Sequence, residues 1–180
     1  RNYDHIPAIS LYYDSYKAFT EVDSAPYFEK LRARIKDQYH QFPKSEMRDL
    51  YVLTINYSIR QINAGQHDFL ENLFDIYKDG LSNDVYIQNE VMSRFTYKNI
   101  VMTGLGLEEF NWVEAFLFAY KDKIKREHRE NTFNYNLAML YYRKPDFTKA
   151  MRLLQQTEFD DPLLNLNARR MLLTIYYTEK

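Results

Sequence analysis

Residues 134–162 read NYNLAMLYYRKPDFTKAMRLLQQTEFDDP, and this stretch decides the fold. Apolar side chains recur three and four residues apart on both sides of Pro145, which predicts two short amphipathic helices. Ala138 and Ala150 lie one in each predicted helix, and such small side chains let two helix backbones approach closely. The large residues expected around the two alanines are Leu137, Tyr141 and Leu154. The stretch therefore predicts a helical hairpin, followed by the start of a third helix.

The composition of the whole chain excludes several classes of protein. Its 24 basic and 25 acidic residues give a net charge of -1, whereas nucleic-acid and anionic membrane surfaces need clustered positive charge. The chain has no cysteine, which excludes disulfides and thiolate metal sites. Its 4 glycines and 5 prolines are fewer than a β-sandwich or a dinucleotide-binding fold needs. No apolar run approaches the roughly 20 residues of a membrane span, and no signal peptide is visible. We therefore expect a cytoplasmic protein with no membrane partner.

Prolines and glycines divide the chain into nine predicted helices. A proline stands just before each of four apolar-periodic runs, at Pro7, Pro26, Pro43 and Pro162. Proline is tolerated at a helix start because its missing N–H would be unpaired there anyway. Ser24 and Asp161 are the expected N-caps, and Gly65 and Gly80 are the expected helix ends. The predicted ranges are 7–21, 26–41, 45–63, 67–79, 93–106, 110–123, 127–143, 147–157 and 162–178.

Between these helices the sequence predicts short connections and no strand. Residues 81–92 fit either a loop or an extra helical turn, and we favour the loop. The first helix is expected to turn its apolar side inward, and that side consists of Ile9, Tyr12, Tyr13, Tyr16 and Phe19. The sequence therefore predicts an all-α chain.

Seven positions within residues 131–164 carry a repeat signature: Leu137, Ala138, Tyr141, Phe147, Ala150, Leu154 and Pro162. In type and spacing they resemble the tetratricopeptide (TPR) repeat family, although Asn134 stands where that family has tryptophan. Units that begin near residues 94 and 51 match less fully. The resemblance implies an α-α superhelix, a TPR-like solenoid of about nine helices in antiparallel pairs, with a concave and a convex face. It also implies a single domain over residues 1–180 that continues past residue 180, because the last predicted helix resembles half of a further unit.

No group of residues has the spacing of a catalytic or metal site. The histidines are scattered, and none forms a metal-binding pair. They are His5, His40, His67 and His128. Gly104 and Gly106 suit a helix end better than a phosphate loop, because no predicted strand precedes them. We therefore expect no enzyme activity, no metal and no cofactor.

Asparagine recurs at one position of the repeat, at Asn56, Asn99 and Asn136. The resemblance implies that this position lines the concave face, where an asparagine of peptide-clamping TPR domains hydrogen-bonds the ligand backbone. An amide has a donor and an acceptor, so it can pair with an extended peptide. The candidate site implied in this way is Lys98, Asn99, Met102, Tyr135, Asn136, Met139, Tyr142 and Arg143. The alternative is that the asparagines bridge neighbouring helices, and the aliphatic residues around Asn56 predict burial there.

We expect a non-enzymatic scaffold whose concave face binds a protein or peptide of unknown identity. One alternative is a regulatory or sensing segment of a larger protein, in which the C-terminal helix docks onto another domain or forms an oligomer. Another is a nucleic-acid-binding array, for which the basic residues are Lys121, Lys123, Lys125, Arg126 and Arg129. Acidic residues interleave with this basic cluster and weaken its field, so nucleic acid is the less favoured partner.

Overall fold

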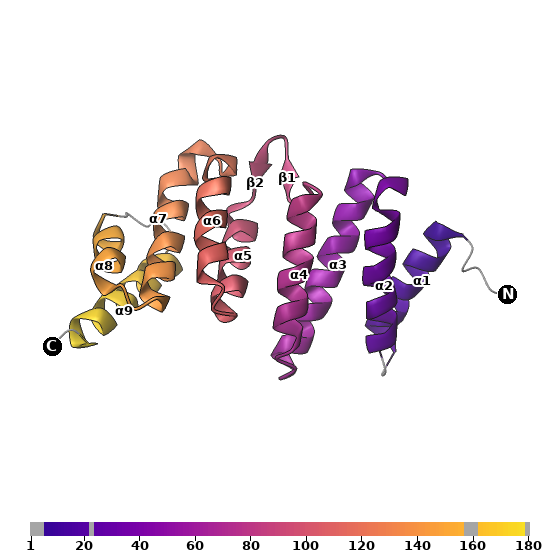
Figure 1. The fold of residues 1–180 in the computed structure, drawn as a ribbon, viewed down its shortest axis with the longest axis horizontal. Helices are drawn as coiled ribbons and strands as arrows, with labels where there is room; N and C mark the ends of the chain where they lie inside the picture. Colours follow the sequence, from indigo (N-terminus) through magenta and orange to yellow (C-terminus); the bar gives the residue numbers. More distant parts are fainter. Residues whose placement is uncertain (1–5, 22–23, 157–161, 179–180) are drawn as a thin grey trace. The chain divides into compact units, whose positions relative to one another are not determined.

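The structure, a computed structural model, describes residues 6–21, 24–156 and 162–178. Within these residues it contains nine α-helices, two short 3-10 helices and one two-stranded β-ribbon. The helices are α1 Pro7–Thr20, α2 Ala25–Gln38, α3 Lys44–Asn63, α4 Phe69–Ser82, α5 Arg94–Gly106, α6 Phe110–Tyr120, α7 Arg126–Arg143, α8 Phe147–Gln155 and α9 Pro162–Thr178 (Figure 1). The short elements are η1 Tyr39–Gln41, η2 Lys121–Lys123, β1 Ile87–Gln88 and β2 Val91–Met92. The predicted all-α chain of paired helices is confirmed.

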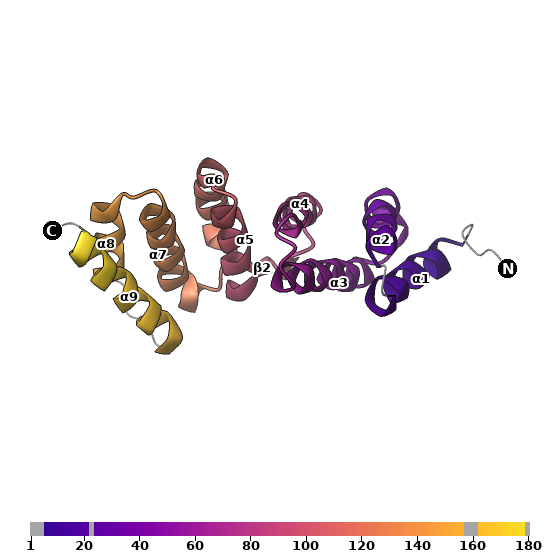
Figure 2. The same cartoon turned by 90° about the horizontal axis from the view of Figure 1, so that it is seen from below.

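The chain divides into two compact units, unit 1 over Arg1–Tyr86 and unit 2 over Ile87–Lys180. In unit 1, α1 packs against α2, α3 packs against α4, and α2 also contacts α3. Figure 2 shows α1 and α3 in one layer of this unit and α2 and α4 in another. The rings of Phe28 and Tyr57 stack 4.2 Å apart in its core, and Phe69 lies against both. Ser24 occupies the predicted N-cap position of α2, but its hydroxyl pairs with the Tyr57 hydroxyl at 2.7 Å instead of capping the helix.

The first helix, α1, buries the side opposite to the expected one. Its buried residues are Ser10, Leu11, Asp14, Ser15 and Ala18. Of the five residues predicted to face inward, only Phe19 packs against the core, so the prediction was wrong for Ile9, Tyr12, Tyr13 and Tyr16. The physical reason is that the Asp14 carboxylate pairs with the Arg34 guanidinium of α2 at 2.7 Å. A buried carboxylate needs such a partner, and this pairing fixes the side that α1 turns toward α2.

The last turn of α3 follows its prediction. Gly65 has a φ of 89°, which glycine adopts without strain, and it follows the C-cap residue Ala64. The N–H groups of Gly65 and Gln66 donate to the carbonyls of Ile62 and Gln61, both at 3.0 Å. These two bonds satisfy carbonyls that the end of the helix leaves open.

The end of α4 corrects the prediction that Gly80 is a helix stop. The helix continues to Ser82, and the ring of Tyr86 lies over Gly80. A Cβ atom at residue 80 would lie 2.4 Å from that ring. The Tyr86 hydroxyl donates to the Ile76 carbonyl at 3.0 Å, which holds the ring in place. Gly80 is therefore needed for close packing inside the helix.

Residues 81–92, predicted as a loop, also hold a β-ribbon. The two strands pair antiparallel, with Ile87 opposite Met92. Asn89 and Glu90 connect them with φ values of 50° and 65°, the left-handed backbone that a two-residue hairpin turn needs. Each strand is two residues long, too short for the alternation by which strands are found in a sequence.

In unit 2, α5 packs against α6, α7 against α8, and α9 against α8, while α7 also contacts α5 and α6. The predicted hairpin is α7 and α8, and Ala138 and Ala150 are both fully buried in its core. Residues of α9 complete this core, which includes Ala168, Met171 and Ile175. The Asp146 side chain caps α8 by accepting from the Lys149 N–H at 3.3 Å. The predicted cap Asp161 lies outside the described residues.

Candidate functional site

One exposed face in unit 2 lies on α5, and we call its residues Phe95, Lys98, Asn99 and Met102 the α5 surface. Spacings of three and four place these side chains on one side of the helix. Phe95 is 63% exposed and Met102 is 38% exposed, Asn99 is exposed, and Lys98 is half-buried. The opposite side of α5 is buried and consists of Tyr97, Ile100, Val101 and Leu105.

The helix that carries this surface is fixed at both ends. Near its start, the Tyr97 hydroxyl donates to the Leu117 carbonyl of α6 at 2.8 Å. Burial raises the pKa of the Tyr97 phenol above its usual range, so the group remains a neutral donor. At the other end, Arg143 of α7 donates from Nη2 to the Leu105 carbonyl at 3.0 Å. The guanidinium satisfies a carbonyl in the last turn of α5, where helices leave such groups open.

The residues predicted on α7 lie in a different environment. Tyr135 is 3% exposed and Asn136 is 2% exposed. Met139 and Tyr142 are half-buried against the core that α9 completes, and only Arg143 is exposed. The structure therefore brings Lys98, Asn99 and Met102 together on one open helix face. It places Tyr135 and Asn136 in the interior, and this corrects the expectation that they line a groove.

The Asn136 amide shows why this position does not face a ligand. Its Nδ2 donates to the Thr132 carbonyl at 2.7 Å, within the same helix. Its Oδ1 is buried and has no hydrogen-bond partner in the described part of the chain. Asn56, for which burial was expected, is exposed on α3 instead. Burial of the three asparagines thus depends on which helices cover them, and the shared repeat position predicted from the sequence does not determine it.

Phe95 was not among the predicted site residues. It lies four residues before Asn99 and seven before Met102, so the spacing of one helix face was the available signal. The preceding Arg94 lies with its guanidinium 5.0 Å from the centre of the Phe95 ring. An aromatic ring, an amide, an amine and a thioether therefore lie on one face, a combination that suits both apolar and polar contacts.

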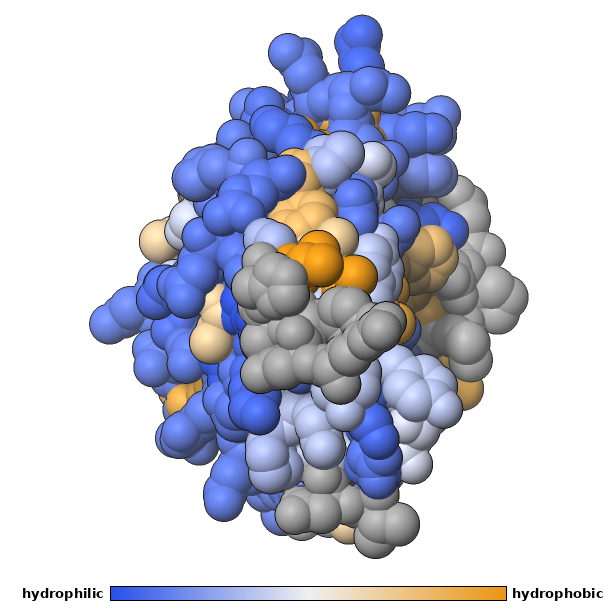
Figure 3. Space-filling view, turned by 90° about the vertical axis from the view of Figure 1, so that its right-hand side faces the viewer, coloured by the Kyte–Doolittle hydropathy of each residue, from blue (hydrophilic) through white to orange (hydrophobic). Residues whose placement is uncertain are grey.

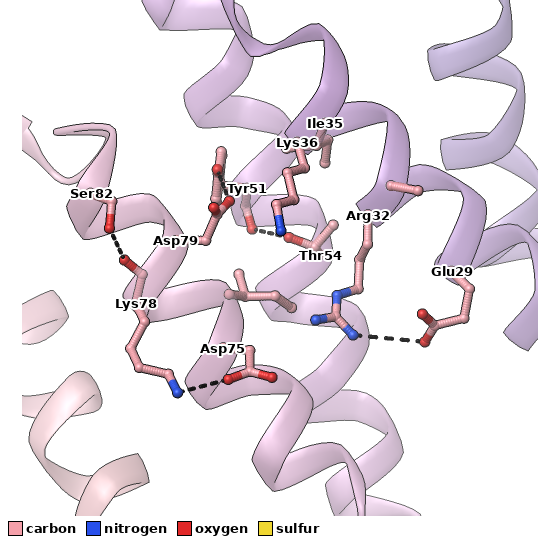
Figure 4. Close-up of a pocket in the computed structure, with 12 residues that line it drawn as sticks. Glu29, Arg32, Ile35, Lys36, Tyr51, Thr54, Asp75, Lys78, Asp79 and Ser82 are labelled. Carbon is pink, nitrogen blue, oxygen red and sulfur yellow. Dashed lines mark hydrogen bonds and ion pairs between the residues drawn. The ribbon is translucent and has the colours of Figure 1, made fainter.

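Unit 1 contains a groove of about 510 Å³ that the sequence did not indicate (Figure 4). Its lining comes from α2, α3 and α4 and consists of Glu29, Arg32, Ala33, Ile35, Lys36, Tyr51, Thr54, Asp75, Ile76, Lys78, Asp79 and Ser82. Most of its charges are matched within the groove: Lys78 pairs with Asp75 at 2.8 Å, and the Tyr51 hydroxyl donates to Asp79. Burial and the Asp79 carboxylate raise the pKa of the Tyr51 phenol above its usual range. Within the described residues Lys36 is the lining cation without an ion-pair or hydrogen-bond partner.

The basic cluster of the sequence lies around η2 and the start of α7, and two of its members are paired. Lys121 lies 3.0 Å from Glu130, and Arg129 lies 3.2 Å from Asp122. Arg129 also donates to the Asp122 and Ile124 carbonyls. Acidic partners thus reduce the positive field of this junction. No helix in the described ranges is at once long enough and apolar enough to pass through a bilayer.

Comparisons of the chain with protein-family models, with curated proteins and with solved structures found no match. The class that the fold defines is an all-α chain built from packed helix pairs. The features of this chain that suggest a function are the α5 surface of unit 2 and the groove of unit 1.

Proposed function

We propose that the chain is a non-enzymatic scaffold that binds a protein or peptide, and that the α5 surface of unit 2 makes the contact. The observation that carries the proposal is the exposure of Phe95 and Met102 on the same face as Asn99 and Lys98. Aromatic side chains and methionine are enriched in protein interfaces, and a few well-buried anchor residues supply most of the binding free energy there. The TPR-like arrangement expected from the sequence supports the same function.

The polar residues of the α5 surface would orient a bound peptide on this apolar contact. The Asn99 amide offers a donor and an acceptor to a peptide backbone, and the Lys98 amine favours a nearby carboxylate. Because Tyr97 and Arg143 hold α5 at both ends, the surface is pre-organised. A rigid surface loses little conformational entropy when a ligand binds.

A random-peptide phage library selected on the immobilised chain, followed by fluorescence anisotropy with the enriched peptides, tests the proposal. We expect Phe95→Ala/Met102→Ala to weaken the affinity at least about ten-fold, because burying one large apolar side chain is worth about 1.5–3 kcal/mol. Phe118→Ala is the matched control, since Phe118 of α6 is 59% exposed. Circular dichroism confirms that each variant is folded.

Two results would contradict the α5 surface. In the first, no peptide is enriched, or the enriched peptide binds the Phe95→Ala/Met102→Ala variant as tightly as the parent. In the second, Lys36→Ala abolishes binding while the α5 variant retains it, which would place the ligand in the unit 1 groove. A loss of affinity in the Phe118→Ala control that equals the loss in the α5 variant would show that the effect is not local.

A further inference from the structure

One face of α1 leaves large side chains about half-exposed or more, although the Tyr13 ring touches the edge of the Tyr27 ring of α2 at 6.3 Å between centres. Tyr16 is 64% exposed, Tyr12 and Tyr13 are each 50% exposed, and Ile9 is 44% exposed. These four residues, which we call the α1 face, lie at spacings of three, one and three residues along one side of the helix. Figure 3 views the molecule from the side where α1 lies in Figure 1, and orange and pale patches interrupt the blue hydrophilic surface there.

The rotation of α1 about its own axis is fixed by polar contacts on its buried side. Asp14 is 3% exposed and pairs with Arg34 at 2.7 Å, and Arg34 also donates to the Ser10 hydroxyl at 3.1 Å. Turning the helix to bury the tyrosines would separate this ion pair, and a buried charge that is left unpaired is strongly destabilising. The described helices of unit 1 therefore have no low-energy way of covering the α1 face with their core.

The charge around this face favours a neutral partner. The face consists of three tyrosines and an isoleucine, with no acidic or basic residue among them, and the lysine at its edge, Lys17, is paired with Glu21. The Tyr12 hydroxyl donates to the Glu46 carboxylate at 2.5 Å. A strongly charged ligand would find no unpaired counter-charge on the face, whereas a second neutral, tyrosine-rich surface meets no repulsion.

We propose that the α1 face is covered by the α1 face of a second copy of this chain, in an antiparallel pair around a two-fold axis. The residue spacing reads the same in both directions, so an axis between Tyr12 and Tyr13 sets Ile9 opposite the second copy's Tyr16. The same axis sets Tyr12 opposite the second copy's Tyr13. Such a self-complementary patch is what a two-fold interface requires.

The area of the face sets the strength of the dimer. A tyrosine buries about 150–250 Å² when fully covered, so the exposed parts of these four side chains offer roughly 400 Å² in each copy. The pair would bury roughly 800 Å² through them, and the flanking Ala8 and Thr20 bring the total close to the roughly 1,000 Å² of a specific interface. An interface at this lower limit gives a reversible dimer whose population depends on protein concentration. This dimer is independent of peptide binding at the α5 surface.

Engineered cysteines test the arrangement directly, because the chain has no cysteine of its own. A mixture of the Ile9→Cys and Tyr16→Cys variants should form a disulfide-linked pair under mild oxidation. Either variant alone should form much less, because the antiparallel axis keeps like positions apart. Efficient cross-linking of Ile9→Cys with itself would overturn the antiparallel pair, and no cross-linking in the mixture would overturn the interface.

Sedimentation equilibrium across a concentration series supplies the second test. The parent should show a monomer–dimer equilibrium, and Ile9→Glu/Tyr16→Glu should raise the dimer dissociation constant more than about ten-fold, because it sets carboxylates opposite each other. Leu166→Glu/Leu173→Glu is the matched control, since both residues are exposed on α9 and have the same spacing. A parent that remains monomeric would overturn the proposal. So would a dimer that only the α9 variant dissociates, which would assign the interface to α9.

Discussion

Asn136 lies in the interior of unit 2 with only half of its amide paired. The donor half reaches the Thr132 carbonyl, while the buried Oδ1 has no partner in the described residues. An unsatisfied buried acceptor lowers stability by about 1–3 kcal/mol, because the group has left water without a replacement bond. The position thus carries a local penalty that an apolar side chain would not have.

Replacing this side chain should therefore be tolerated. We expect Asn136→Leu, which keeps the branching at Cγ, to leave the free energy of unfolding of unit 2 unchanged or to raise it by up to about 1–2 kcal/mol. Urea denaturation followed by circular dichroism measures the change. Asn99→Leu on the exposed side of α5 is the control and should shift stability by no more than about 0.5 kcal/mol.

Asn136→Ala removes the amide without adding atoms. It therefore separates the effect of losing a buried polar group from the effect of packing a larger leucine at this position. If both Asn136 variants lose more than about 2 kcal/mol, the Oδ1 has a partner in solution, such as a buried water, and the assignment of an unpaired acceptor is wrong.

At the scale of an element, the end of α4 depends on a contact between Gly80 and the Tyr86 ring. Glycine inside a helix is usually replaced by alanine with a gain in stability of about 0.5–1 kcal/mol. Here the added Cβ would overlap the ring, and the ring is held by its bond to Ile76 and by packing against Tyr77 and Tyr51. The overlap therefore outweighs the gain in helix propensity.

We expect Gly80→Ala to destabilise unit 1 by roughly 1–3 kcal/mol through overpacking. In a Tyr86→Ala background the same substitution should change sign and stabilise the helix by about 0.5–1 kcal/mol. Chemical denaturation of the parent, the two single variants and the double variant forms the cycle that measures this coupling. Equal effects of Gly80→Ala in both backgrounds would show that the ring does not restrict this position.

The helix ranges were predictable from the sequence because their signals are local. Proline at helix starts and a glycine at the end of α3 act within a few residues of the backbone they terminate. The rule that a glycine ends a helix failed at Gly80. This glycine is needed for contact with the ring of Tyr86, which folds back over the helix from beyond its end. The β-ribbon escaped prediction because its two-residue strands carry no periodic pattern.

Which face of a helix turns inward was harder to predict. The apolar periodicity of α1 identifies an apolar face but does not show whether that face turns toward the core or toward solvent. The orientation follows from the pairing of Asp14 with Arg34, a residue on the next helix. For the candidate site, the sequence identified Lys98, Asn99 and Met102 on α5 but could not show that Asn136 is buried. The burial of α7 residues by α5, α6 and α8 is a tertiary feature, and no local pattern in α7 encodes it.

At the scale of the whole molecule, each unit has its own core, and each core contains phenols with raised pKa values. Burial raises the pKa of Tyr51 and Tyr86 in unit 1 and of Tyr97 in unit 2. Below a pH of about 10 these tyrosines are neutral in both the folded and the unfolded chain, so the shifts do not affect stability. Above that pH the unfolded chain loses protons that the folded chain keeps, and stability falls as the pH rises.

We therefore expect the free energy of unfolding to decrease above a pH of about 10 by about 1.4 kcal/mol per pH unit for each buried phenol. Urea denaturation at a series of pH values, combined with phenolate absorbance, measures both stability and ionisation. Tyr97→Phe should remove the contribution of unit 2 while the contribution of unit 1 remains. Ionisation of all 17 tyrosines near their ordinary pKa in the folded chain would contradict the prediction.

The outward face of α1 has a consequence for how unit 1 opens. Leu11 is the one large side chain among the fully buried residues of this helix, Phe19 packs half-buried against the core, and the other buried side chains are small or polar. The helix therefore detaches with less loss of apolar contact than any helix that contributes several large core residues, and its amides should exchange with solvent first. Self-association through the same face would oppose this fraying by mass action. Local opening of α1 should therefore become rarer as the protein concentration rises.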